Sequence, residues 1–237
     1  MGAYNHVADY PSAWPILRRD YSCPPHRSEQ ACIIARLYQS YRYYPASGSS
    51  AAANLRKGMR IAIVGAGGVG GYFGAKLAVS GEEVHFIARG AHLDAIKRDG
   101  LRVLSANGDV LVKPALATNE TASVGPVDLV IIAVKLWSTE DAVRDAKPLI
   151  GPATALLSFQ NGVFAADVIA QTYGKEHTLG GVANIAALIE KPGVIRHNGT
   201  MALLTVGELD GRRSARVEQF LHTCAKANIQ ARAATTS

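Results

Sequence analysis

The sequence predicts an α/β fold, a doubly wound and mostly parallel sheet with a β-hairpin extension. Three observations lead to this fold class. The apolar run Ile61–Val64 ends in the glycine loop Gly65–Gly70, and a helical pattern and a second apolar run, Glu83–Ala88, follow it. The run Asp128–Val134 is apolar almost throughout, which is typical of a central parallel strand buried on both faces. Strands that alternate with helices in this way indicate a Rossmann-like fold.

The glycine loop is the first candidate binding site, because Gly65, Gly67 and Gly70 have the G-x-G-x-x-G spacing. We expect the first glycine to allow a sharp turn, the second to let backbone N–H groups approach a pyrophosphate, and the third to let the helix pack closely on the sheet. The pyrophosphate would lie at the positive end of the helix dipole. A glycine-rich turn of another α/β protein is the alternative. The cofactor-binding residues expected here are Gly65, Ala66, Gly67, Gly68, Val69 and Gly70.

The end of the second strand indicates which dinucleotide binds. An NAD site normally has Asp or Glu there, to hold the ribose 2′-hydroxyl, but no carboxylate lies between Glu83 and Asp94 in this sequence. Arg89 stands at this position instead, and its planar guanidinium suits a 2′-phosphate. The sequence therefore predicts NADP(H) rather than NAD or FAD. A solvated surface arginine is the alternative interpretation of Arg89.

The other elements follow from hydrophobic periodicity and turn signals. A helix is expected at 72–80. Strands at 101–105 and 110–113 should form a hairpin through Asn107-Gly108, a strong hairpin signal. The strand 128–134 comes next. The remaining predictions are helices at 139–147, 164–173 and 212–227, and strands at 153–159, 179–188, 193–197, 201–207 and 229–233.

Two polar residues follow strands that should end at the ligand-binding edge of the sheet. Lys135 ends the strand 128–134, and Asn161 follows the strand 153–159. A lysine there would place a cation near the nicotinamide, and an asparagine amide can both donate and accept hydrogen bonds. Each residue also has a plainer interpretation, Lys135 as a surface lysine and Asn161 as a turn former before Gly162.

Composition separates residues 1–58 from the rest. This segment holds seven of the nine tyrosines and carries +4 of the net charge of +6, and Met59 stands directly before the first strand. We therefore expect 1–58 to be a disordered or artefactual leader and 59–237 to be one dinucleotide-binding domain. The three scattered cysteines form no disulfide framework, which favours a cytoplasmic location. No basic stripe with interleaved aromatic residues indicates nucleic acid. The uncharged, glycine-rich stretch 61–75 in the dinucleotide region has 15 residues, which is too short for a membrane span.

These motifs together resemble the ketopantoate reductase (2-dehydropantoate 2-reductase) family from Met59 to the end of the chain. The resemblance implies NADPH on the glycine loop and Arg89, Lys135 and Asn161 at the nicotinamide and the substrate, and Ala187 lining the cofactor cleft. His197 matches a family position, but a lone histidine in a hairpin is more often structural. The segments that carry the resemblance are Ile61–Gly70, Arg89-Gly90, Val134–Trp137, Gln160–Gly162, Gly181–Ala187, Gly193–Gly199 and Val206–Glu208.

The resemblance also implies a C-terminal helical domain that opens with a Trp-x-Lys segment, whose lysine is the general acid. No such segment precedes Ser237, and neither Lys191 nor Lys226 has the matching context. We therefore expect the general acid beyond Ser237 and assign no catalytic residue in this chain.

The expected function is 2-dehydropantoate 2-reductase, the NADPH-dependent reduction of ketopantoate to pantoate for coenzyme A biosynthesis, in a truncated form. The alternatives are another NADP-dependent 2-keto acid or hydroxyacid reductase, and a non-catalytic NADP(H)-binding fragment. The expected partners are a small 2-keto acid and, as a possibility for the assembly, a second copy of the chain. No metal site is expected.

Overall fold

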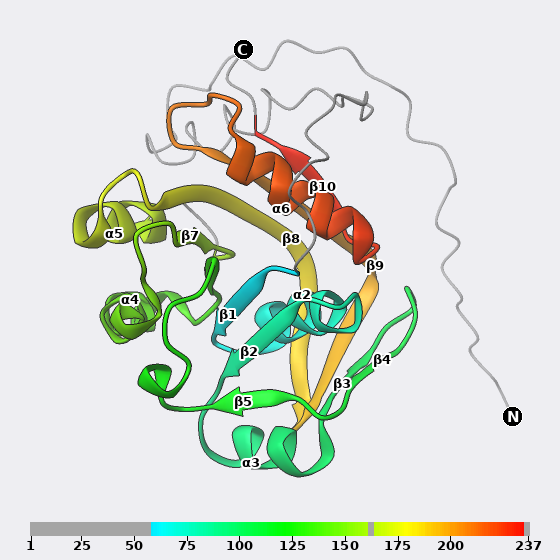
Figure 1. Cartoon of the computed structure of the whole chain (residues 1–237). Helices are drawn as coiled ribbons and strands as arrows, with labels where there is room; N and C mark the ends of the chain where they lie inside the picture. Colours follow the sequence, from blue (N-terminus) through cyan, green and yellow to red (C-terminus); the bar gives the residue numbers. More distant parts are fainter. Residues whose placement is uncertain (1–57, 161–163, 235–237) are drawn as a thin grey trace, which may run out of the picture. The chain divides into compact units, whose positions relative to one another are not determined.

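The computed structural model describes residues 58–160 and 164–234, so the predicted leader lies outside the described residues except for Gly58. In this part of the chain ten strands form one mixed sheet, in the order β4-β3-β9-β8-β7-β6-β1-β2-β5, and β10 pairs with β9 (Figure 1). The strands are β1 Arg60–Val64, β2 Glu83–Ile87, β3 Leu101–Leu104, β4 Val110–Val112, β5 Leu116–Thr118, β6 Leu129–Ile132, β7 Ala155–Ser158, β8 Thr178–Lys191, β9 Val194–Glu208 and β10 Gln230–Ala233.

Helices connect most of the parallel strands. The α-helices are α2 Gly68–Val79, α3 Gly90–Asp99, α4 Thr139–Asp145, α5 Phe164–Tyr173 and α6 Ala215–Lys226, and the short 3₁₀ helices are η1 Thr121–Ser123, η2 Leu136–Ser138 and η3 Lys147–Leu149. Ser214 caps α6, because its hydroxyl accepts a hydrogen bond from the N–H of Val217. In the described residues no helix is both long enough and apolar enough to cross a bilayer.

The parallel centre of the sheet is buried on both faces, as the apolar runs predict. Strands β5, β2, β1, β6, β7 and β8 run parallel to one another. Side chains alternate along β1: Ile61 and Ile63 pack into the core that contains α2, whereas Ala62 and Val64 pack into a second core with residues of α4 and α5. This arrangement is the doubly wound, Rossmann-like sheet that the sequence predicts.

The remaining strands curl the sheet around α2. Strands β8 and β9 form a long antiparallel hairpin, and β3 then pairs in parallel with the first part of β9. As a result α2 contacts β1, β2, β3, β4, β8 and β9 (Figure 1). Strands β3 and β4 form the hairpin predicted from Asn107-Gly108, with Gly108 at a φ of +101°. The expected β-hairpin extension is therefore confirmed.

The prediction of separate strands at 193–197 and 201–207 is wrong, because both belong to the single strand β9. The residues between the two predicted strands, which include Asn198-Gly199, form a bulge within β9. His197 pairs with Ala187 and Ala202 pairs with Ile185, so four residues of β9 lie opposite one residue of β8, and Gly199 has a φ of +79°.

Helix α3 and strand β5 were not predicted. The residue at the N-cap of α3 is Arg89, whose side chain makes no capping hydrogen bond, so the sequence carries no start signal there. Strand β5 has three residues, too few for a periodic pattern. Helix α2 also begins four residues before the predicted start, because its first turn is the glycine-rich segment itself.

Candidate functional site

The glycine loop joins the carboxyl end of β1 to α2. Gly65 has a φ of +100°, a left-handed conformation that favours glycine, so the predicted sharp turn is confirmed. The N–H groups of Gly65 and Ala66 both donate to the carbonyl oxygen of Ile87, at 3.1 and 3.2 Å. These two bonds fix the loop against the end of β2, which is where the next candidate residue, Arg89, lies.

The start of α2 has the properties of an anion site. No side chain caps it at Gly67, and its first turn contains no acidic residue. The first N–H groups of a helix have no partner within the helix and carry partial positive charge, so they favour an anion. A Cβ atom added to Gly67 would meet no heavy atom within 4 Å, so the space beside the loop is open.

Close packing explains the third glycine of the motif. A Cβ atom on Gly70 would lie 2.2 Å from the carbonyl oxygen of Gly65 and 2.8 Å from Cγ2 of Ile63. Any side chain there would push α2 off the sheet, so the expected role of Gly70 is confirmed. Residues Gly65–Gly67 thus form the turn, and Gly68, Val69 and Gly70 form the first turn of α2.

Strand β8 crosses directly beside this turn. A Cβ atom on Gly68 would lie 2.2 Å from the carbonyl oxygen of Ala187. Ala187 therefore adjoins the glycine loop, at the place that the family resemblance implies. Its role as a cofactor-binding residue stays a prediction.

Arg89 follows β2, the strand whose end holds the glycine loop. It is the N-cap residue of α3, and its backbone is extended. Its side chain is 78% exposed, and Nη2 lies 3.1 Å from Oδ2 of Asp145, at the end of α4. The sequence contains no carboxylate near Arg89, but the fold supplies one from a distant segment. The Asp145 backbone is held in turn by Thr121, whose hydroxyl donates to the Asp145 carbonyl at 2.6 Å. Asp145 is thus a site residue that sequence reasoning missed.

Lys135 lies at the carboxyl end of β6, which is the neighbour of β1 in the sheet, and its side chain is exposed. The fold therefore places Lys135, the glycine loop and Arg89 along one edge of the sheet. Asn161 lies outside the described residues, so its expected position beside Lys135 stays a prediction.

Gln160 was not among the predicted site residues, but its side chain links the strand ends at this edge. Its buried side chain donates from Nε2 to the carbonyl oxygen of Val134 at 2.7 Å and contacts the hydroxyl of Thr139 at 2.9 Å. The hydroxyl of Ser158, at the end of β7, donates to Oε1 of Gln160 at 3.3 Å. Gln160 therefore connects the ends of β7 and β6 and fixes the backbone that carries Lys135.

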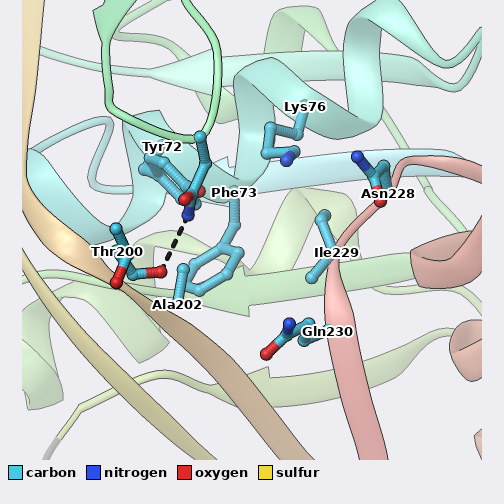
Figure 2. Close-up of a pocket in the computed structure, with 9 residues that line it drawn as sticks. Tyr72, Phe73, Lys76, Thr200, Ala202, Asn228, Ile229 and Gln230 are labelled. Carbon is cyan, nitrogen blue, oxygen red and sulfur yellow. Dashed lines mark hydrogen bonds between the residues drawn. The ribbon is translucent and has the colours of Figure 1, made fainter.

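Two cavities lie near these elements. The first, about 240 Å³, adjoins Lys135 and is lined by Leu136, Trp137, Glu140, Asp141 and Phe164. The second, about 280 Å³, lies beside the later turns of α2 rather than at the glycine loop. Figure 2 shows Lys76 from α2, Asn228, and Gln230 from the start of β10 around it. Partial burial lowers the pKa of Lys76, whose ammonium lies 5.8 Å from the centre of the Tyr72 ring.

Two further residues, His197 and Cys224, are buried away from this edge. His197 is buried, with Nδ1 2.8 Å from the hydroxyl of Ser105 and Nε2 3.0 Å from the carbonyl oxygen of Met201. Cys224 is a free, buried thiol, and burial raises its pKa to about 12. Neither residue contributes to the edge that carries the glycine loop.

Comparison with known proteins identifies the family to which this fold belongs. Residues 61–211 match the family described as "Ketopantoate reductase PanE/ApbA". A 2-dehydropantoate 2-reductase of Mesorhizobium japonicum is 34% identical over 194 residues, which covers 73% of this chain and 59% of the relative. An uncharacterized oxidoreductase of Bacillus subtilis, YkpB, is 33% identical over 159 residues, which covers 67% of this chain and 52% of the relative.

Solved structures give the same result for the fold. The 2-dehydropantoate 2-reductase of Porphyromonas gingivalis W83 superposes with a TM-score of 0.71 at 32% identity, covering 75% of this chain and 64% of that one. A ternary structure of D-mandelate dehydrogenase with NADH and anilino(oxo)acetate superposes with a TM-score of 0.67 at 27% identity, covering 74% and 56%. The chain thus spans between about half and two thirds of the length of these relatives.

Proposed function

The chain belongs to the ketopantoate reductase family, and on that premise we propose that its described residues form the NADPH-binding part of a 2-dehydropantoate 2-reductase. The reaction transfers a hydride from NADPH to the 2-keto carbon of ketopantoate and gives pantoate. One observation carries the proposal. The open, uncapped start of α2 lies at the same sheet edge as the exposed guanidinium of Arg89.

The roles of the individual residues follow from their chemistry. The N–H groups of Gly67–Gly70 would hold the pyrophosphate at the start of α2, Gly65 and Ala66 would shape the turn before it, and Ala187 would close one side of the loop. Arg89 would donate charge-assisted hydrogen bonds to the 2′-phosphate. The bound cofactor supplies the hydride, which this chain has no group to provide.

Lys135 and Asn161 would lie at the nicotinamide and the keto acid. The Lys135 ammonium is exposed at the end of β6 and would attract the carboxylate of the keto acid. The alkoxide that forms also needs a proton donor. We assign that step to no described residue.

A direct test measures binding before turnover. Titration of the purified chain with NADPH and NADH, followed by nicotinamide fluorescence, should show binding with a preference for NADPH. Absence of binding to both would contradict the proposal. NADPH consumption with ketopantoate then tests the reaction, and a fusion to the C-terminal half of a longer relative tests whether the proton donor lies there. Binding without turnover in the fusion would favour the non-catalytic alternative.

A second candidate function has a specific observation in its favour. The carboxylate of Asp145 beside Arg89 is the kind of group that accepts a hydrogen bond from a ribose 2′-hydroxyl. This favours a reductase of another 2-keto acid that accepts NADH as well. Comparable affinity for the two cofactors, together with faster turnover of an aromatic 2-keto acid than of ketopantoate, would support it.

Assembly and location are secondary proposals. We propose a cytoplasmic protein whose partner is the small keto acid, with a homodimer as the possible assembly. Sedimentation of the purified chain at several concentrations distinguishes a monomer from a dimer.

A further inference from the structure

His92 connects the glycine loop to a turn far along the chain. It lies in the first turn of α3, three residues after Arg89, and is half-buried. Its Nε2 lies 2.8 Å from the carbonyl oxygen of Ala66. Its Nδ1 lies 3.0 Å from the backbone nitrogen of Gly193, in the turn between β8 and β9.

These two contacts indicate which ring nitrogen donates and which accepts. The backbone N–H of Gly193 can only donate, so Nδ1 must be the acceptor and carries no proton. The carbonyl oxygen of Ala66 can only accept, so Nε2 must carry the proton. Nε2 of His92 is therefore the donor and Nδ1 the acceptor, and both nitrogens are used.

The bond to Ala66 has a consequence for the neighbouring residue. The peptide that joins Ala66 to Gly67 is planar and trans, so its carbonyl and its N–H point in opposite directions. With the carbonyl held by His92, the N–H of Gly67 is turned to the side away from His92. Gly67 is the residue at the N-cap of α2, and the space beside it is open.

We propose that His92 is a positioning residue for dinucleotide binding, which orients the Ala66–Gly67 peptide so that its N–H faces the pyrophosphate. This inference rests on the function proposed above. It adds a residue outside the G-x-G-x-x-G motif that acts on the motif through one hydrogen bond. It also separates two roles within one ring: Nε2 serves binding, and Nδ1 anchors the β8–β9 turn.

Two conservative variants separate these roles. A glutamine at position 92 can place its amide N–H where Nε2 lies, so His92→Gln keeps the donor to Ala66 and loses the acceptor for Gly193. An asparagine reaches only as far as Nδ1, so His92→Asn keeps the acceptor for Gly193 and loses the donor to Ala66. We expect His92→Gln to bind NADPH within about twofold of the wild type, and His92→Asn to bind it roughly three- to tenfold more weakly.

The cofactor pair gives a second readout. The pyrophosphate is common to NADPH and NADH, so His92→Asn should weaken both by the same factor, whereas Arg89→Ala should weaken NADPH alone. His177 provides a matched control, because its Nδ1 also bonds a backbone carbonyl, that of Thr154 at 2.7 Å, in another part of the fold. His177→Asn and His177→Gln should leave both affinities unchanged, and circular dichroism checks that every variant is folded.

The outcomes are distinct. If His92→Gln and His92→Asn bind equally well, or if His92→Gln is the weaker binder, the ring acts through the turn and the proposal is overturned. If His92→Asn loses NADPH affinity but not NADH affinity, the effect passes through Arg89 and the proposal is again overturned. If the wild type binds neither dinucleotide, the proposed function fails, and this inference fails with it.

Discussion

The two ends of the candidate site differ in how firmly the fold holds them. At the glycine loop, backbone bonds to Ile87, the ring of His92 and the backbone of β8 all fix the chain. At the end of β6, the side chains of Lys135, Leu136 and Trp137 are exposed, and that of Trp137 is 84% exposed. Only the backbone beneath them is fixed, by Gln160.

This difference separates two tasks of the proposed reductase. The glycine loop, which is the proposed phosphate end, is preorganised, so binding there should lose little affinity to ordering of the loop. The nicotinamide end presents side chains that can still adapt to a bound molecule. Substitutions at the first end should therefore change affinity and folding together, and substitutions at the second end should leave phosphate recognition intact.

The largest expected effect is that of Gly70→Ala. Its Cβ would meet backbone at 2.2 Å, which cannot move without displacing the loop. We expect a loss of about 1–3 kcal/mol of stability and a fall of more than about 100-fold in NADPH affinity, because several hydrogen bonds to the phosphates are lost together. Thermal unfolding and fluorescence titration measure the two effects.

Gly67→Ala is the matched control for the loss of stability expected of Gly70→Ala. A Cβ there meets nothing within 4 Å and the φ of −74° suits alanine, so the melting temperature should stay unchanged. Affinity should fall, because the new methyl group occupies the space expected for the pyrophosphate. A normal melting temperature and normal binding for both variants would contradict the assigned roles of the loop.

Arg89→Ala comes next. Removal of charge-assisted hydrogen bonds worth about 1.5–3 kcal/mol should weaken NADPH binding by roughly 10- to 100-fold and leave NADH binding unchanged. Competition between the two cofactors measures the change in preference. A variant that keeps the wild-type preference for NADPH would show that another residue holds the 2′-phosphate.

Gln160→Leu tests the other end of the site. The substitution leaves the carbonyl of Val134 without its side-chain donor and removes the bonds of the Gln160 amide to the hydroxyls of Ser158 and Thr139, which costs about 1–3 kcal/mol. The melting temperature should fall by about 2–4 °C per kcal/mol, with little change in NADPH affinity. The exposed residue Gln171, on α5, gives the control Gln171→Leu, which should be neutral. A collapse of NADPH affinity in Gln160→Leu would mean that the two ends are not independent.

Asp145→Asn should have the smallest effect, and in the opposite direction. The carboxylate competes with a phosphate for Arg89, and exposed pairs of this kind are worth about 0.2–1 kcal/mol, so NADPH affinity should rise by up to about fivefold. Asp141→Asn on the same helix is the control, because Asp141 pairs with Arg144 instead. Equal changes in the two variants would indicate a general charge effect. The second candidate function also requires NADH affinity to fall in Asp145→Asn.

The parts of the site that the sequence predicted are those set by neighbouring residues. The glycine loop, Arg89 and Lys135 each follow directly from a strand, and a strand pattern together with the residue at its end is a local signal. The site of Ala187 came from the family resemblance, and the structure places it beside Gly68.

The residues that were missed act across long separations. Asp145 lies 56 residues from Arg89, and His92 bonds Gly193 across 101 residues. No periodicity or spacing encodes such contacts, because they arise only when distant segments come together in the folded sheet. Helix α3 was missed for a different reason, since its first residues, Gly90 and Ala91, resemble a loop and its N-cap carries no capping side chain.

The curl of the sheet also determines the order in which parts of this chain can fold. Strand β3 pairs with β9 through Arg102 and Val194, and α2 lies within the curl that this pairing closes. Contacts between residues so far apart in sequence form late and slowly during folding. During synthesis, residues 65–70 leave the ribosome long before the β8–β9 hairpin that completes their surroundings. The proposed dinucleotide site would therefore be incomplete in the nascent chain, and a cofactor that binds only the closed sheet would stabilise the whole folded domain rather than the loop alone.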